Sequence, residues 1–171
     1  MSAKKTVHDL LTDEIKDLHS AEKQLTKAIP KMAKGSTDLG LRAAFSAHLK
    51  ETEKQVERLE QVGEMLGISP SGKKCIGMQG CIKEGGESIE EEGDERILDL
   101  GLIGAATRVE HYEMAGYTAA KSLAQRLRND DVVALLKASL AEEQAADQKL
   151  RTIGAGLLKS APTEAAAKSR A

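Results

Sequence analysis

The 171-residue chain has few aromatic residues: two Tyr, one Phe and no Trp. Sites for single-stranded nucleic acid stack bases on aromatic side chains, so this composition argues against such a platform. A basic excess is also absent, because 25 Lys and Arg residues stand against 27 Asp and Glu residues. The net charge of −2 therefore gives no reason to expect nucleic acid or an anionic membrane surface as a partner.

Long apolar runs are absent too, since none approaches the roughly 18 residues that a membrane helix needs. The N-terminal sequence MSAKKTVHDLL becomes acidic before the hydrophobic region of a secretion signal could form. We therefore expect a cytoplasmic protein without a membrane segment. The only cysteines, Cys75 and Cys81, lack the second close pair or nearby histidines of a zinc site, and their role stays open.

The remaining sequence is rich in Ala, Leu, Glu, Lys and Gln, which favours an all-α protein. Amphipathic periodicity predicts four long helices, and a glycine-rich stretch between the second and third predicts a short one. Two antiparallel hairpins joined by such a crossover are typical of a ferritin-like four-helix bundle. We expect the bundle to cover residues 1–158 and a flexible tail to cover 159–171. The segments are approximately 6–34, 38–66, 67–93 (crossover), 94–127 and 131–158.

Acidic residues interrupt the apolar stripes of three predicted helices. In the first helix, Glu22 takes a position in a stripe whose other members are apolar and recur at steps of three and four. Glu110 and Glu113 do the same in the third long helix, and Glu143 and Asp147 in the fourth. His111 lies about 100° around the helix from Glu110 and faces away. These carboxylates therefore point into the predicted core.

Residues equally distant from a hairpin turn lie at the same height, and this places the acidic residues in pairs. Glu22 pairs in height with Glu51, which lies at the margin of the second helix's apolar side. His48 and Gln55 fall within that apolar side. They are candidates for residues that hydrogen-bond to the metal ligands without binding the metal themselves. The other pairs are Glu110 with Asp147 and Glu113 with Glu143.

Several unpaired buried carboxylates would together exceed the net stability of a typical domain, about 5–15 kcal/mol. Protonation, internal water or bound cations are the remaining ways to compensate them. Carboxylates from four helices at one level are the arrangement of dimetal bundles, and oxygen ligands suit divalent iron and manganese. The sequence thus predicts metal ligands at Glu22, Glu51, Glu110, Glu113, Glu143 and Asp147.

Five stretches of the chain resemble the YciE/YciF family of bacterial ferritin-like stress proteins. They are DLHSAEKQL (17–25), HLKETEKQVERLE (48–60), GMQGCIKEGGE (77–87), VEHYEMAGY (109–117) and LAEEQAADQKL (140–150). The resemblance implies a ferritin-like bundle, a centre of two divalent ions, homodimerisation and production under stress. The chain departs from the Glu-x-x-His pairs of other ferritin-like proteins, because Lys54 and Ala146 stand three residues after Glu51 and Glu143. The identity of the metal therefore stays open.

Two functions are compatible with these features. The first is a dimetal protein that handles iron, oxygen or peroxide during stress, as a ferroxidase or peroxidase-like enzyme. The second is a non-enzymatic dimeric interaction protein in which metal is only structural. A face of the third long helix with Gly101, Gly104 and Ala115 could accept close helix packing in such a dimer.

Overall fold

The computed structural model describes residues 6–163, and within this range the chain forms five α-helices and no strand. Residues 164–171 of the predicted tail lie outside the described part. The structure therefore confirms an all-helical protein with four long helices and a short one in the crossover. The helices are α1 (Val7–Gly35), α2 (Leu39–Leu66), α3 (Ile76–Glu90), α4 (Glu95–Arg126) and α5 (Asp130–Leu158).

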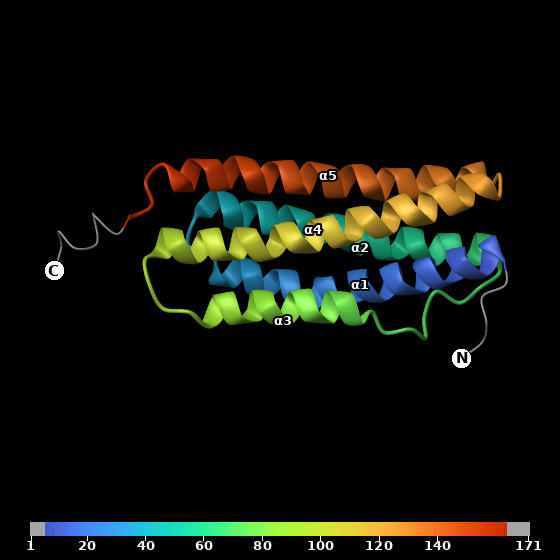
Figure 1. Cartoon of the computed structure of the whole chain (residues 1–171), viewed down its shortest axis with the longest axis horizontal. Helices are drawn as coiled ribbons and strands as arrows, with labels where there is room; N and C mark the ends of the chain where they lie inside the picture. The colour runs from blue at the N-terminus through green and yellow to red at the C-terminus, as the bar shows by residue number, and fades with distance from the viewer. Residues whose placement is uncertain (1–5, 164–171) are drawn as a thin grey trace.

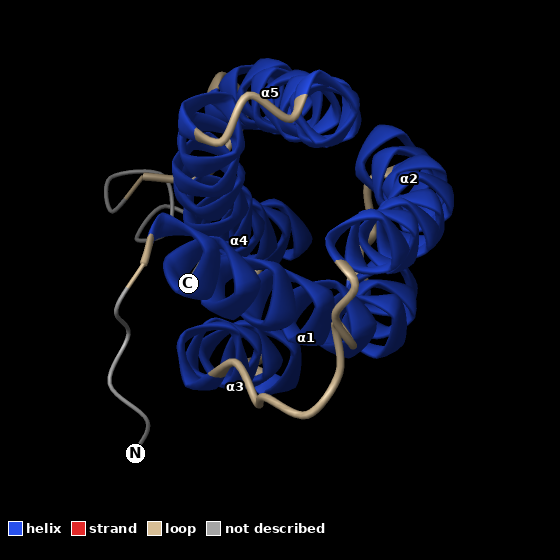
Figure 2. Cartoon of the chain, turned by 90° about the vertical axis from the view of Figure 1, so that its right-hand side faces the viewer, coloured by secondary structure: helices blue, strands red, loops and turns tan. Residues whose placement is uncertain are grey.

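The four long helices lie side by side along the long axis of the molecule (Figure 1). Viewed from the end, α1, α2, α5 and α4 follow one another around a ring, and α3 lies outside it (Figure 2). The packing agrees, because α1 contacts α2 and α4, α5 contacts α4 and α2, and α3 contacts α4 and α1. Every pair of neighbours in the ring is antiparallel (Figure 1). One wall of the ring, α2 against α5, joins segments far apart in the sequence.

Local sequence signals set the helix ends. The Thr6 hydroxyl accepts a hydrogen bond from the Asp9 N–H while the Asp9 carboxylate accepts one from the Thr6 N–H, a capping box that begins α1. Asp38 caps α2, and Gly67 ends it in a left-handed conformation. The predicted ends of the long helices are correct to within one residue, and Pro30 lies inside α1. The crossover helix spans Ile76–Glu90, within the predicted crossover of 67–93.

The hydrophobic core is divided into two clusters that lie on either side of the acidic residues. Along α1, Leu18 belongs to one cluster and Leu25 to the other, with Glu22 between them. Along α5, Leu140 and Leu150 stand in the same relation to the two acidic positions there. The chain thus forms two apolar layers. Between them lies a polar layer, which we define by the buried acidic residues Glu22, Glu110, Glu113, Glu143 and Asp147.

Asp99, near the start of α4, fixes the height of one hairpin against the other. Its buried carboxylate accepts hydrogen bonds from the Thr37 N–H (2.9 Å), the Thr37 hydroxyl (2.6 Å) and the Asp38 N–H (2.7 Å). These groups form the α1–α2 turn. Glu110 stands eleven residues after Asp99, or about 17 Å along the helix, and Glu51 thirteen residues after Asp38, or about 20 Å. The acidic positions of both hairpins therefore meet at similar heights.

None of the helices in the described part of the chain has the length and apolar character needed to cross a membrane.

Candidate metal centre

Four buried side chains from three helices come together in the polar layer. His48 comes from α2, Glu110 and Glu113 from α4, and Glu143 from α5. Each offers one nitrogen or oxygen atom, and these atoms all lie within 4.8 Å of one another. The Nε2 atom of His48 lies 3.4 Å from a Glu110 oxygen and 3.7 Å from a Glu143 oxygen. We call these four residues the carboxylate cluster.

Glu22 contributes from the remaining long helix, α1, and is fully buried. The hydroxyl group of Tyr117 donates a hydrogen bond to one of its carboxylate oxygens, and the other oxygen has no partner. Tyr117 is itself fully buried, one turn along α4 from Glu113. Its phenol thus replaces one of the water contacts that Glu22 gives up in the core.

Asp147 lies at the edge of the polar layer, beside Arg151 and His111. The Nε atom of Arg151 donates a hydrogen bond of 2.8 Å to its Oδ2 atom, and Nε2 of His111 lies 3.3 Å from its Oδ1 atom. As predicted, His111 is outside the cluster, and about half of its side chain is exposed (52%). Asp147 is therefore better compensated than the four buried glutamates.

Glu51 is the most exposed of the predicted ligands, with 42% of its side chain accessible to solvent. It is one of the neighbours of His48, since its Oε2 atom lies 3.3 Å from Nδ1 of that ring. His48 therefore bridges Glu51 at the surface and Glu110 in the interior. We expected His48 to stand behind the ligands, but the structure places it directly among the carboxylates.

Gln55 and Arg58, further along α2, hold the acidic pair Glu142 and Glu143 of α5. The Gln55 amide donates hydrogen bonds to both carboxylates, with 3.1 Å to Glu142. Arg58 forms a two-pronged ion pair with Glu142, in which Nη2 and Oε1 are 2.7 Å apart. Glu142 is thus paired with Arg58, whereas the hydrogen bond that Glu143 accepts comes from a neutral amide. Gln55 thus contacts Glu143, one of the residues that the sequence predicts as ligands.

Burial and mutual repulsion change the pKa values in the cluster. Burial and the nearby Glu143 carboxylate raise the pKa of Glu110 well above its ordinary value of 4.5. Burial, followed by repulsion from Glu22 and Glu143, does the same to the pKa of Glu113. Burial lowers the pKa of His48, but its hydrogen bond with Glu51 and the nearby carboxylates outweigh this, and the net pKa is raised. A positive charge placed among these carboxylates would therefore stabilise their ionised form.

The unpaired atoms of the polar layer show where a cation fits. No hydrogen-bond partner within residues 6–163 reaches one oxygen each of Glu22, Glu110, Glu143 and Asp147, or either oxygen of Glu113. A buried carboxylate oxygen without a partner is strongly destabilising, and a divalent cation would compensate several at once. Carboxylates with one imidazole are a donor set that suits iron and manganese. The carboxylate cluster can therefore hold a metal ion.

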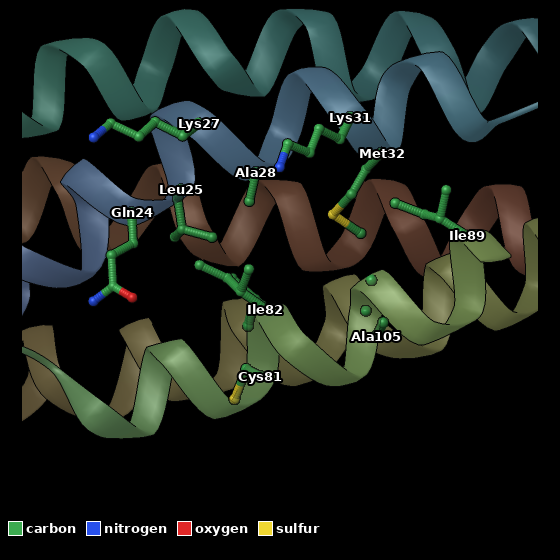
Figure 3. A pocket seen from close by; sticks show the side chains of 13 residues that line it. Gln24, Leu25, Lys27, Ala28, Lys31, Met32, Cys81, Ile82, Ile89 and Ala105 are labelled. Carbon is green, nitrogen blue, oxygen red and sulfur yellow. The ribbon is translucent and has the colours of Figure 1, made fainter.

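Neither cysteine belongs to this site. The fully buried thiol of Cys75 lies 3.0 Å from both an Asp17 oxygen and the Tyr112 hydroxyl, on the side of α1 that faces α3. Burial raises the pKa of Cys75. The side chain therefore stays protonated, and a thiol is less reactive than a thiolate. Cys81 lines an apolar groove between α1 and α3, where Leu25, Met32, Ile82 and Ile89 lie close together (Figure 3). Both cysteines are free of disulfide bonds.

Fold and site together define an all-helical protein with a buried cluster of carboxylates and one histidine between two apolar layers. Residues 6–162 match the domain of unknown function DUF892, and the chain belongs to that family. It is 42% identical over 147 residues to the protein YciF of Escherichia coli K12, covering 85% of this chain and 89% of the relative. The resemblance to the YciE/YciF family of stress proteins is therefore confirmed.

Solved structures agree with this assignment. The crystal structure of the E. coli stress protein YciF matches with a TM-score of 0.89 and 39% identity, covering 92% of this chain and all (100%) of that one. YcfI from Rhodopseudomonas palustris matches with a TM-score of 0.83 and 43% identity, covering 86% and 94%. A protein from Xanthomonas campestris shares the fold at 20% identity and a TM-score of 0.69, covering 90% and 97%.

Proposed function

We propose that this protein is a ferritin-like dimetal carboxylate protein that handles iron, oxygen or peroxide during stress. The observation that carries the proposal is the set of buried carboxylate oxygens in the polar layer that have no partner in the described chain. Two divalent ions, iron or manganese, would compensate them. In this proposal the ring of α1, α2, α4 and α5 is a four-helix bundle of the ferritin-like type.

The ligands would divide between the ions by position. His48, Glu110, Glu113 and Glu143 form the group that is close enough for one ion. Glu22, Glu51 and Asp147 surround this group and would complete the coordination of both ions. A bound pair of iron or manganese ions would supply redox chemistry toward oxygen or peroxide, as a ferroxidase or peroxide-handling centre.

Other side chains of the chain would orient these ligands. Gln55 holds Glu143 through its amide, and Tyr117 holds Glu22 through its hydroxyl. Arg151 fixes Asp147 from outside the layer. Contacts of this kind fix the direction of a ligand's lone pairs and typically change metal affinity about 10–100-fold when removed.

The wider biological context is also part of the proposal. The E. coli relative YciF is a stress protein, which supports a stress-related role here. We place the protein in the cytoplasm as a homodimer, with residues 1–158 as one domain. A dimer could pack through the face of α4 that carries Gly104 and the exposed Ala115. Light scattering of the purified protein at several concentrations would measure the oligomeric state.

A metal titration tests the proposed function. Metal-free protein is mixed with Fe(II) without oxygen, or with Mn(II), and its melting temperature and binding heat are recorded. We expect saturable binding and a rise in melting temperature, and Glu113→Gln should abolish both. Exposed Glu53 on α2 provides the matched control, Glu53→Gln. A protein whose melting temperature and heat signal do not respond to either metal would refute the proposal.

A non-enzymatic role with structural metal is the second candidate. The four-donor cluster favours it, because structural sites commonly fill their coordination shell with protein ligands, as zinc sites do. Turnover separates the two functions: the loaded protein is mixed with Fe(II) and oxygen or peroxide, and oxidation is followed by absorbance. Catalytic oxidation beyond the bound metal supports the enzyme, and a single stoichiometric event supports the structural role.

A further inference from the structure

A groove between α2 and α5 opens onto the carboxylate cluster. It has a volume of about 410 Å³, and its lining includes two cluster members, His48 and Glu110. The groove between α1 and α3, in contrast, contains no residue of the cluster (Figure 3). The α2–α5 groove therefore connects the buried polar layer with the protein surface.

Small residues create this groove. Alanines line it from both sides, and Phe45 and Leu150 add larger apolar surface (the alanines are Ala43, Ala44, Ala47, Ala145 and Ala146). Further along α2 the same pair of helices is closed, because Gln55 and Arg58 bridge to Glu142. The opening is thus confined to the part of the α2–α5 wall that leads to His48 and Glu110.

The buried side chain of Glu110 lines the inner part of the groove. Glu110 is only 3% exposed, and its Oε2 atom has no hydrogen-bond partner in the described chain. The other charged lining residues, Glu51 and Lys149, lie at the accessible rim on opposite helices. A ligand in the groove would consequently meet apolar walls along its length and a carboxylate at its head.

These features define the chemical class of the ligand. The volume falls in the range of small-molecule sites, about 300–1,000 Å³, and is far larger than peroxide or a bare ion requires. Apolar walls favour an apolar body. A charged head would lose its hydration between these walls, whereas a hydroxyl group can form a hydrogen bond with the Glu110 carboxyl group.

We propose that the α2–α5 groove binds a small neutral organic molecule with one hydroxyl group, such as a phenol, whose hydroxyl reaches Glu110. The ring would lie against Phe45 and the alanines. The molecule would serve as the organic co-substrate or ligand of the centre proposed above, so the inference rests on that function for its biological meaning. Binding itself requires only the groove and can be measured without metal.

Nuclear magnetic resonance on metal-free protein with a chelator tests the proposal. Phenol is titrated, with benzoate as a probe of equal ring size and negative charge. We expect saturable shifts at Ala44, Phe45, Ala47 and Ala145 with phenol, and at least about tenfold weaker binding of benzoate because its charge would lose its hydration between the apolar walls. Ala44→Leu and Ala146→Leu, tested separately, should each weaken phenol binding at least about tenfold by filling the groove. Exposed Ala119 of α4 lies outside the groove, so Ala119→Leu is the control.

Three results would overturn the inference: phenol shifts elsewhere in the protein, equal or tighter binding of benzoate, or unchanged phenol affinity in both groove variants. Concentration-dependent shifts at the groove without ligand would also overturn it, because a second copy of the chain would then cover the surface. Protein that binds phenol but no metal would refute the metal proposal alone. Protein that binds metal but no phenol would refute this inference alone.

Discussion

The imidazole Nε2 atom of His48 lies 3.4 Å from Oε1 of Glu110, so a side chain of α2 meets a side chain of α4 across the middle of the protein. The two helices are not neighbours in the ring, since each packs against α1 and α5. Their side chains meet because the polar layer occupies the centre between the two apolar clusters. His48 is thereby the one nitrogen donor among the carboxylates of the cluster.

His48→Ala is expected to weaken binding of Fe(II) or Mn(II) by about 10–100-fold, because it removes a donor that the carboxylates cannot replace. Glu51→Gln should weaken it less, since Glu51 is half exposed and touches the cluster through His48. Isothermal titration calorimetry of both variants measures the difference. Equal losses in the two variants would show that His48 is not a direct ligand.

The stability of the metal-free protein should fall as the pH rises above about 4.5. The raised pKa values of Glu22, Glu110 and Glu113 mean that the folded protein binds more protons than the unfolded chain in this range. Their contribution is complete below the ordinary pKa of 4.5 and is lost as the pH approaches the raised values. The raised pKa of His48 acts in the same direction, with loss starting above its ordinary value of 6.5.

Thermal unfolding in chelator at pH 5, 7 and 9 checks this dependence, and Mn(II) should reverse it, because metal binding displaces the protons. Glu113→Gln should make the fall in stability with pH shallower, since it removes one of the carboxyl groups whose pKa is raised by folding. The exposed control Glu53→Gln should change little. A metal-free protein that becomes more stable from pH 5 to pH 9 would contradict the account.

Tyr117→Phe is expected to lower the free energy of unfolding by about 1–3 kcal/mol, because Glu22 loses its hydrogen-bond donor in a fully buried position. The loss should be larger in the metal-free protein than in the metal-loaded protein, where an ion also holds Glu22. Urea unfolding with and without Mn(II) measures both values. Equal losses in the two states would argue that Glu22 is not a ligand.

Asp99→Ala should destabilise the protein by roughly 2–4 kcal/mol, because three hydrogen bonds from Thr37 and Asp38 end on this buried carboxylate. It should also weaken metal binding, since Asp99 fixes the height of α4 against the α1–α2 turn. Exposed Glu92 before α4 gives the control Glu92→Gln. Calorimetry measures the metal affinity of both variants. An unchanged affinity in Asp99→Ala would show that the two hairpins keep their relative position without this contact.

The sequence predicts much of this architecture because its signals are local. Caps such as Asp38 and Asn129 and the apolar period determine the helix ends, and the steps of three and four place Glu22 and Glu113 on the inner face. Height within a hairpin follows from counting residues to the turn. These arguments need no knowledge of distant contacts.

Relations between the hairpins are harder to predict. The Asp99 contact that matches their heights joins residues about 60 positions apart and has no periodic signature. His48 could be assigned to the apolar side of α2, but its distance to Glu110 depends on how α2 faces α4. The ion pair between Arg151 and Asp147 could have been predicted from the sequence, because the two residues stand four positions apart on the same helix.

Anomalous X-ray scattering at the iron and manganese absorption edges, from crystals of protein purified without chelator, tests the metal centre most directly. We predict two peaks in the polar layer, with one among His48, Glu110, Glu113 and Glu143. Elemental analysis of the same protein should give the matching metal content. The absence of any peak, even after incubation with Fe(II) or Mn(II), would contradict the account.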